Sequence, residues 1–145
     1  MPRTAPIAVL LVLAACEPDP QLPDCVDLAF EIDTCGPLYQ PTFDNVYDSS
    51  MHNRCDSAGG ACHAKDGASG TKNGLVLSDA DTAHAALMGE SHGRPFVDVE
   101  DPACSVLLVR LAVDDEDFRM PPGEFARPDN KLCSIAKWMA AGAER

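Results

Sequence analysis

Basic residues are scarce in this sequence. It contains 11 Lys and Arg residues against 23 Asp and Glu residues, so its formal net charge is −12 with the histidines neutral. Binding to nucleic acid, or to an anionic membrane surface, requires clusters of basic side chains. The composition therefore argues against both kinds of ligand, and it favours a protein partner that presents a basic docking face.

Apolar runs long enough to cross a membrane are also missing. Residues 7–13 form a short apolar run, whereas a membrane-spanning helix needs about 20 such residues. Residues 1–15 instead resemble a secretory signal peptide, with Arg3 before the run and small residues at its end. Because Leu13-Ala14-Ala15 precedes Cys16 as in a bacterial lipobox, we expect lipidation of Cys16. The alternative is an ordinary signal peptide followed by an incidental cysteine.

The domain plan follows from the length and from the position of the prolines. A chain of 145 residues is long enough for one domain but not for two. Residues 16–41 are rich in proline, so we expect an extended, lipid-anchored tether. Residues 42–145 then form the domain. We expect an exported protein of the cell envelope, anchored to a membrane and facing the periplasm or the cell exterior.

Seven cysteines are too many for a reducing cytosol unless they bind metal. Cys25 and Cys35 bracket a short loop, which predicts a local disulfide between them. Cys104 and Cys133 lie at matching ends of two apolar segments, which predicts a second disulfide. That bridge would clamp the base of the intervening loop.

Apolar residues at helical spacing predict helices that begin near Thr42, near Ser78 and at Pro128. Residues 104–111 form an apolar run that could be a strand or a buried helix. We favour a helix, because the neighbouring segments are helical and no turn dipeptide or partner strand lies nearby. The sequence therefore predicts an all-α fold, a small bundle of about four helices with long loops that is stapled by disulfides.

The most informative stretch ends in Cys62-His63 and contains Cys55 seven residues upstream. A cysteine followed by a histidine is typical of covalent haem attachment, where the histidine becomes an axial ligand of the iron. The usual signature has two residues between its cysteines, and this one has six. Met120 is a candidate for the second axial ligand. Two prolines follow it directly, and their fixed dihedral angles stiffen the segment that would present the sulfur.

The chain from Phe43 to Ala143 resembles a class I cytochrome c domain, in particular the exported bacterial variants with an Arg-Met-Pro-Pro turn. The resemblance implies covalently bound haem c, with thioether bonds from Cys55 and Cys62. It implies His63 as the proximal iron ligand and Met120 as the distal one, in a protein that transfers electrons to a redox partner and is not an enzyme. The matching segments are Cys62-His63, residues 74–77, residues 105–111, residues 119–123 and residues 138–143.

Three alternatives remain open at the level of the sequence. Cys55 and Cys62 could form a disulfide in a haem-free structural or binding lipoprotein, with Met120 as an ordinary core side chain. A metal site could recruit His52 together with the same two cysteines and the histidine that follows them. His84 or His92 could replace the methionine as the distal ligand.

Overall fold

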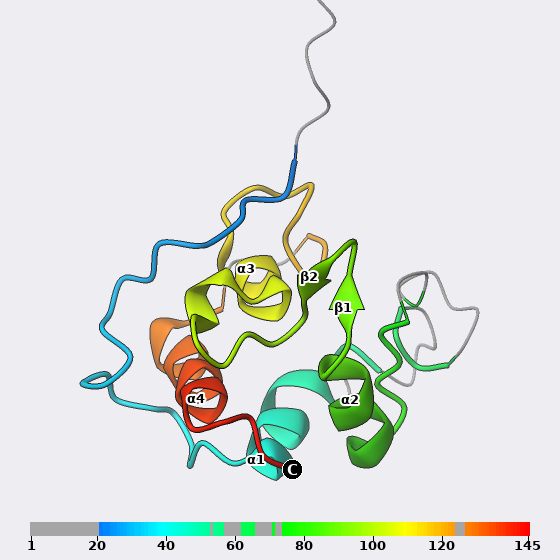
Figure 1. Cartoon of the computed structure of the whole chain (residues 1–145), viewed down its shortest axis with the longest axis horizontal. Helices are drawn as coiled ribbons and strands as arrows, with labels where there is room; N and C mark the ends of the chain where they lie inside the picture. The colour runs from blue at the N-terminus through cyan, green and yellow to red at the C-terminus, as the bar shows by residue number, and fades with distance from the viewer. Residues whose placement is uncertain (1–20, 53, 57–61, 66–70, 72–73, 124–126) are drawn as a thin grey trace, which may run out of the picture.

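The computed structural model describes residues 21–52, 54–56, 62–65, 71, 74–123 and 127–145, so the signal segment and Cys16 lie outside it. Across those residues no helix is long and apolar enough to cross a bilayer. The elements in chain order are α1 (Phe43–Val46), the π-helix η1 (Tyr47–Met51), α2 (Ala80–Leu87), β1 (Glu90–Ser91), β2 (Arg94–Pro95), the 3₁₀-helix η3 (Pro102–Cys104), α3 (Val106–Ala112) and α4 (Asp129–Ala140) (Figure 1).

The prediction of an all-α fold is wrong, because β1 and β2 pair as a small antiparallel sheet beside the four α-helices of the described chain. His92 and Gly93 join the two strands with φ angles of 53° and 76°. Positive φ at both central residues is the geometry of the tight turns whose twist suits antiparallel strands. Each strand has only two residues, so the sequence carries no alternating pattern that would reveal it.

The choice of a helix for the apolar run at residues 104–111 is confirmed, because Cys104 ends η3 and residues 106–111 form most of α3. Helix α2 begins at Ala80, close to the predicted start near Ser78. The Asp79 carboxylate accepts the backbone N–H of Thr82 at 2.9 Å and its hydroxyl at 2.8 Å, so Asp79 caps the helix. These hydrogen bonds lower the pKa of Asp79, since they favour the charged carboxylate.

The core is built around α4, which packs against α1, α3 and η3 (Figure 1). Trp138 of α4 lies against Phe43 of α1, with 5.2 Å between the ring centroids. Trp138 also donates its indole N–H to the carbonyl of Glu144 at 2.9 Å, which satisfies its polar atom. The same hydrophobic core contains the fully buried side chains of Val46, Leu87, Leu108, Ile135 and Met139.

Residues 21–41, which we call the strap, lie along the domain on the side of α3 and α4 before the chain enters α1 (Figure 1). The backbone N–H of Val26 donates to the Ala103 carbonyl at 3.0 Å. Further along, the buried Ser134 hydroxyl of α4 accepts the backbone N–H groups of Leu38 and Tyr39 at 2.8 and 3.2 Å. The strap is therefore fixed to the C-terminal half of the chain by specific hydrogen bonds.

Two disulfides join the strap to the domain, and both predicted pairings are wrong. Cys25 is bonded to Cys104, 79 residues away, and Cys35 is bonded to Cys133, 98 residues away. The strap runs past the start of α3 and along α4, so it brings each of its cysteines to a partner that is distant in sequence. Spacing alone does not determine the connectivity of four cysteines.

Candidate functional site

A cavity of about 240 Å³ lies between η1, the hairpin, α3 and the turn that carries Met120. It unites three of the predicted site residues, because Cys55, His63 and Met120 all line it. The rest of its wall is largely apolar. The apolar residues that line it include Met51, Leu75, Leu77, Phe96, Val106 and Leu111.

Backbone and side-chain hydrogen bonds fix His63 at this cavity. Its backbone N–H donates to the Cys55 carbonyl at 3.1 Å, and its own carbonyl accepts the Leu77 N–H at 2.7 Å. The ring atom Nδ1 lies 2.9 Å from the Leu75 carbonyl oxygen. Because a carbonyl only accepts hydrogen bonds, Nδ1 carries the proton of the neutral ring and Nε2 keeps its lone pair. Metal-binding histidines commonly donate one ring N–H to a carbonyl in this way.

Cys55 and Cys62 both carry thiols and are half-buried. The Sγ of Cys55 donates to the Ser50 carbonyl at 3.8 Å, at the end of η1 and at the edge of the cavity. Neither cysteine belongs to the two disulfides between described residues. The structure therefore differs from the alternative in which these two cysteines form a bridge. Residues 57–61 between them lie outside the described chain.

The C-terminal end of α3 positions the Met120 turn. The Arg110 carbonyl accepts the backbone N–H of Met120 at 2.7 Å, and the Leu111 carbonyl accepts the N–H of Arg127 at 3.2 Å. These carbonyls belong to the last turn of α3, where intrahelical partners run out. The loop between α3 and α4 is thus held at both ends by the helix it leaves. The predicted clamp, a Cys104–Cys133 bridge, does not exist.

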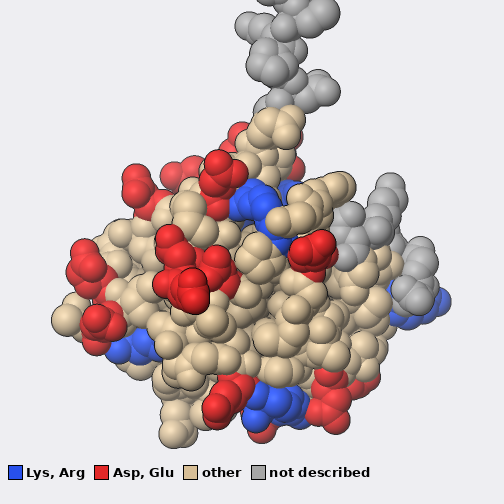
Figure 2. Space-filling view, viewed as in Figure 1, with Lys and Arg blue, Asp and Glu red and all other residues tan. Residues whose placement is uncertain are grey.

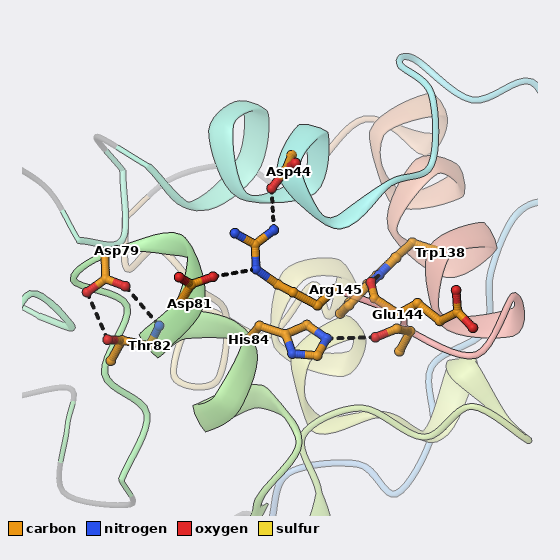
Figure 3. A network of polar contacts seen from close by, with 9 residues as sticks. Asp44, Asp79, Asp81, Thr82, His84, Trp138, Glu144 and Arg145 are labelled. Atoms are coloured by element: carbon orange, nitrogen blue, oxygen red, sulfur yellow. Dashed lines mark hydrogen bonds and ion pairs between the residues drawn. The ribbon is translucent and has the colours of Figure 1, made fainter.

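The two histidines considered as replacements for Met120 do not line the cavity. The Nε2 of His84 lies 2.8 Å from the Ala143 carbonyl oxygen, and its ring meets the Phe43 ring edge-on. Figure 3 shows His84 in a polar network in which Arg145 pairs with two aspartates. His92 is exposed in the hairpin turn.

The alternative metal site gains no support from the positions of its residues. The Nδ1 of His52 lies 2.8 Å from the Asp56 carboxylate, and the ring stacks on Tyr47 with 5.6 Å between centroids. In the part of the chain that the structure describes, the grouping of potential metal ligands is instead Cys25, Asp101 and Cys104. Two of these three residues are the halves of one disulfide, so their sulfur atoms are not thiolates.

Arg110 and Tyr47 also belong to the site, although neither lies in a recognisable sequence motif. Arg110 lines the cavity from α3, and its signal in the sequence is a single charge inside the apolar helix Val106–Ala112. The buried Tyr47 lies beside the cavity wall, where its hydroxyl is 3.3 Å from an Asp56 carboxylate oxygen and 3.2 Å from the Leu77 carbonyl oxygen. The sequence does not mark Tyr47 as a site residue, because a tyrosine at a core position of a helix is common.

Stability at alkaline pH tests the role of Tyr47. Burial and the neighbouring Asp56 carboxylate raise its pKa to about 12, compared with about 10 in an unfolded chain. Because the pKa is raised in the folded protein, the contribution of Tyr47 to the free energy of unfolding is fully present below about pH 10. This contribution is lost as the pH rises towards 12. We expect this loss to be roughly 2–3 kcal/mol. Urea unfolding should show that the free energy of unfolding falls clearly less at alkaline pH for Tyr47→Phe than for the wild type. An equal fall in the two proteins would contradict a raised pKa for Tyr47.

Comparison with known proteins adds one relationship. Residues 60–124 match the model of the family described as Planctomycete cytochrome C. The matched segment contains Cys62, His63 and Met120 and begins after Cys55. The match supports a cytochrome c-like domain. Neither a curated protein nor a solved structure matches the chain.

Proposed function

We propose that this chain is a lipid-anchored, monohaem c-type cytochrome-like protein that transfers electrons, with His63 and Met120 as the axial ligands of the haem iron. One observation carries the proposal. An imidazole with its Nδ1 proton directed to the Leu75 carbonyl and a thioether on a stiffened turn line the same apolar cavity. Imidazole and thioether are the axial pair of electron-transferring cytochromes c.

The donor residues at the cavity fit a covalently held haem. Cys62 directly precedes His63, as in the usual attachment signature, and the Cys55 thiol lies at the cavity despite the wider spacing. Bound haem would supply a one-electron iron couple. The chain would contribute two axial ligands that together leave no coordination position for a substrate. This arrangement favours electron transfer over catalysis, and we propose no enzyme activity.

The partner and the location are part of the same proposal. Residues 114–117 are four exposed acidic side chains on the loop that also carries Met120. In Figure 2, Asp and Glu side chains are spread over much of the visible face. A redox partner with a basic docking face would complement this charge. A lipid on Cys16 would hold the domain at a membrane of the cell envelope.

A haem-free lipoprotein of the same fold is the second candidate. The observation that favours it is that two disulfides, Cys25–Cys104 and Cys35–Cys133, already staple the domain. Such cross-links stabilise a small domain by restricting its unfolded chain, with no contribution from a cofactor. In this case the cavity would serve another apolar ligand, or it would be only a packing defect.

Haem attachment separates the two candidates. When the full chain is expressed with a c-type haem attachment system, we expect a sharp reduced α-band and haem that stays on the protein in a denaturing gel. His63→Ala should change the spectrum of the iron while the thioether bonds keep the haem attached. His92→Ala is the matched control and should change neither property, because His92 is exposed and lies outside the cavity. Colourless wild-type protein would refute the electron carrier.

The same preparation tests the anchor. The haem-containing protein should fractionate with membranes and dissolve on addition of detergent. Cys16→Ser should remove the acceptor of the lipid, and the haem colour should then move to the soluble fraction or stay with unprocessed precursor. A Cys16→Ser protein that is processed normally and remains in the membrane fraction would contradict lipidation at this residue.

A further inference from the structure

The two disulfides differ in how far solvent reaches their sulfur atoms. Cys25 is exposed and Cys104 is half-buried. In the other bridge Cys35 is half-buried, and Cys133 is completely buried in α4. A disulfide is reduced when a thiolate attacks one of its sulfur atoms, so access to the sulfur limits the reaction. The Cys25–Cys104 bridge is therefore open to a reductant, and the Cys35–Cys133 bridge is shielded.

A carboxylate lies beside the accessible bridge. The Oδ2 of Asp101 is 3.1 Å from the Sγ of Cys104. A disulfide sulfur carries no proton, so the carboxylate accepts no hydrogen bond from it while the bridge is intact. After reduction, the Cys104 S–H has this carboxylate as an acceptor. Because this hydrogen bond stabilises only the reduced form, it makes the bridge easier to reduce at equilibrium.

The first part of the strap, residues 21–34, is bound to the domain only at the surface. None of its side chains is fully buried, and Leu28, Phe30 and Ile32 pack against the core while partly exposed. Its carbonyl at Pro23 accepts a hydrogen bond from the exposed Arg94 guanidinium at 3.0 Å. Segments with few buried apolar contacts and solvent-exposed hydrogen bonds open at a low cost in free energy. The bridge at Cys25 is therefore the main restraint on this part of the strap.

The strap beyond Cys35 has separate attachments to α4. The buried Ser134 hydroxyl accepts the backbone N–H groups of Leu38 and Tyr39. The Leu38 N–H also donates to the Asn130 carbonyl at 2.9 Å. Opening of the first bridge therefore releases the strap only as far as Cys35.

We propose that the Cys25–Cys104 bridge is a reducible clasp, which a dithiol reductant opens to release residues 21–34. A thiolate of the reductant attacks the exposed Cys25 Sγ, the disulfide bond breaks, and Cys104 leaves as a thiolate that takes up a proton. The second thiol of the reductant then displaces Cys25 from the mixed disulfide. The two cysteines gain two electrons and two protons, and the reductant becomes a disulfide.

Opening of the clasp lengthens the connection between the domain and Cys16. This consequence rests on the proposed function, since it assumes a lipid on that residue. With both bridges intact, the chain from Cys16 to Cys25 spans at most about 30 Å. After reduction the next bridged residue is Cys35, and the span to it is at most about 65 Å. The redox state of the clasp thus sets how far from the membrane the electron carrier reaches a partner.

A purely structural bridge is the competing explanation. In that case the Cys25–Cys104 bridge would be reduced only when the domain unfolds. The two bridges would then open together, and the packing of the core would be lost in the same transition.

The test equilibrates the full chain with mixtures of reduced and oxidised glutathione, blocks the thiols, and identifies each bridge by peptide mass. We expect half-reduction of Cys25–Cys104 at a value of [GSH]²/[GSSG] at least about tenfold lower than for Cys35–Cys133. Between the two transitions the fluorescence of Trp138, which is buried in the core, should stay unchanged.

Hydrogen exchange measures the release of the strap in the same samples. The Val26 amide donates to the Ala103 carbonyl, so it should lose its protection when the first bridge opens. The Leu38 amide is held by α4 and is the internal control, because it should stay protected until the second bridge is reduced.

Two matched variants test the contribution of the carboxylate. Asp101→Ala removes the acceptor of the Cys104 thiol, so reduction of the first bridge should require a higher value of [GSH]²/[GSSG]. Glu100→Ala removes a charge from the neighbouring exposed position, and it should leave the first transition where it is. Equal shifts in the two variants would overturn the role of Asp101.

The outcomes separate this inference from the proposed function. Simultaneous reduction of the two bridges, or a Val26 amide that keeps its protection after the first transition, would overturn the clasp. These measurements need neither haem nor lipid. Colourless protein, or a Cys16 without lipid, would therefore overturn parts of the proposed function and leave the clasp itself intact.

Discussion

Met120→Ala should lower the reduction potential of the haem-containing protein and remove the weak sulfur-to-iron absorption band of its oxidised form. A neutral thioether paired with imidazole raises the potential of haem iron, so its loss favours the ferric state. We expect the reduction potential to fall by a substantial part of the roughly 0.8 V range that axial ligands control. The turn itself should persist, because its hydrogen bond to Arg110 uses the backbone. Spectroelectrochemical titration measures both changes.

Met139→Ala is the matched control for this substitution. Met139 is fully buried in α4 and lies outside the cavity. Its truncation should cost about 2–5 kcal/mol of stability through the cavity that it creates, with little effect on the absorption band. If Met120→Ala instead lost stability alone, in a protein that carries haem, the distal ligand would have to be another group.

Removal of the Cys35–Cys133 bridge should lower the free energy of unfolding more than removal of the Cys25–Cys104 bridge. This disulfide joins two residues that are 98 positions apart in the sequence. In the chain-entropy model, closing a loop of that size stabilises the folded state by about 4–5 kcal/mol. Cys133 is also completely buried, so the double variant Cys35→Ala with Cys133→Ala loses packing as well. Urea unfolding under non-reducing conditions measures the difference from the wild type.

The second bridge provides the comparison. Cys25 and Cys104 are separated by 79 residues, and the logarithmic dependence on loop length makes their entropic contribution almost the same. Cys25 is exposed, however, so Cys25→Ala with Cys104→Ala should lose less packing. We expect the smaller destabilisation for this pair. A larger loss here than for Cys35 and Cys133 would contradict the burial argument.

The sequence predicts the helices correctly wherever a long segment has one strongly apolar face. The choice of a helix over a strand at residues 104–111 is confirmed by α3, and the expected last helix after Pro128 is α4. The hairpin was not readable, because its geometry depends on two residues with positive φ, His92 and Gly93. A histidine in that conformation gives no recognisable turn signal.

The sequence identifies residues of the site only where they form a motif. Cys55, His63 and Met120 were selected from the sequence, and all three line the cavity. Arg110 belongs to no motif, and a charged residue in an apolar helix is normally expected to reach solvent. The pairing of the disulfides was beyond any argument from spacing, since it depends on the path of the strap across α3 and α4.

The order of the two bridges along the chain has a topological consequence. Cys25 pairs with Cys104 and Cys35 pairs with Cys133, so each bridge has one end inside the loop that the other closes. A single cut of the backbone anywhere between Cys25 and Cys133 therefore leaves at least one bridge connecting the two fragments. A protease that cleaves once in this interval does not separate the C-terminal part from the N-terminal segment. The damage becomes visible as two bands only after reduction, while the unreduced protein keeps its full mass.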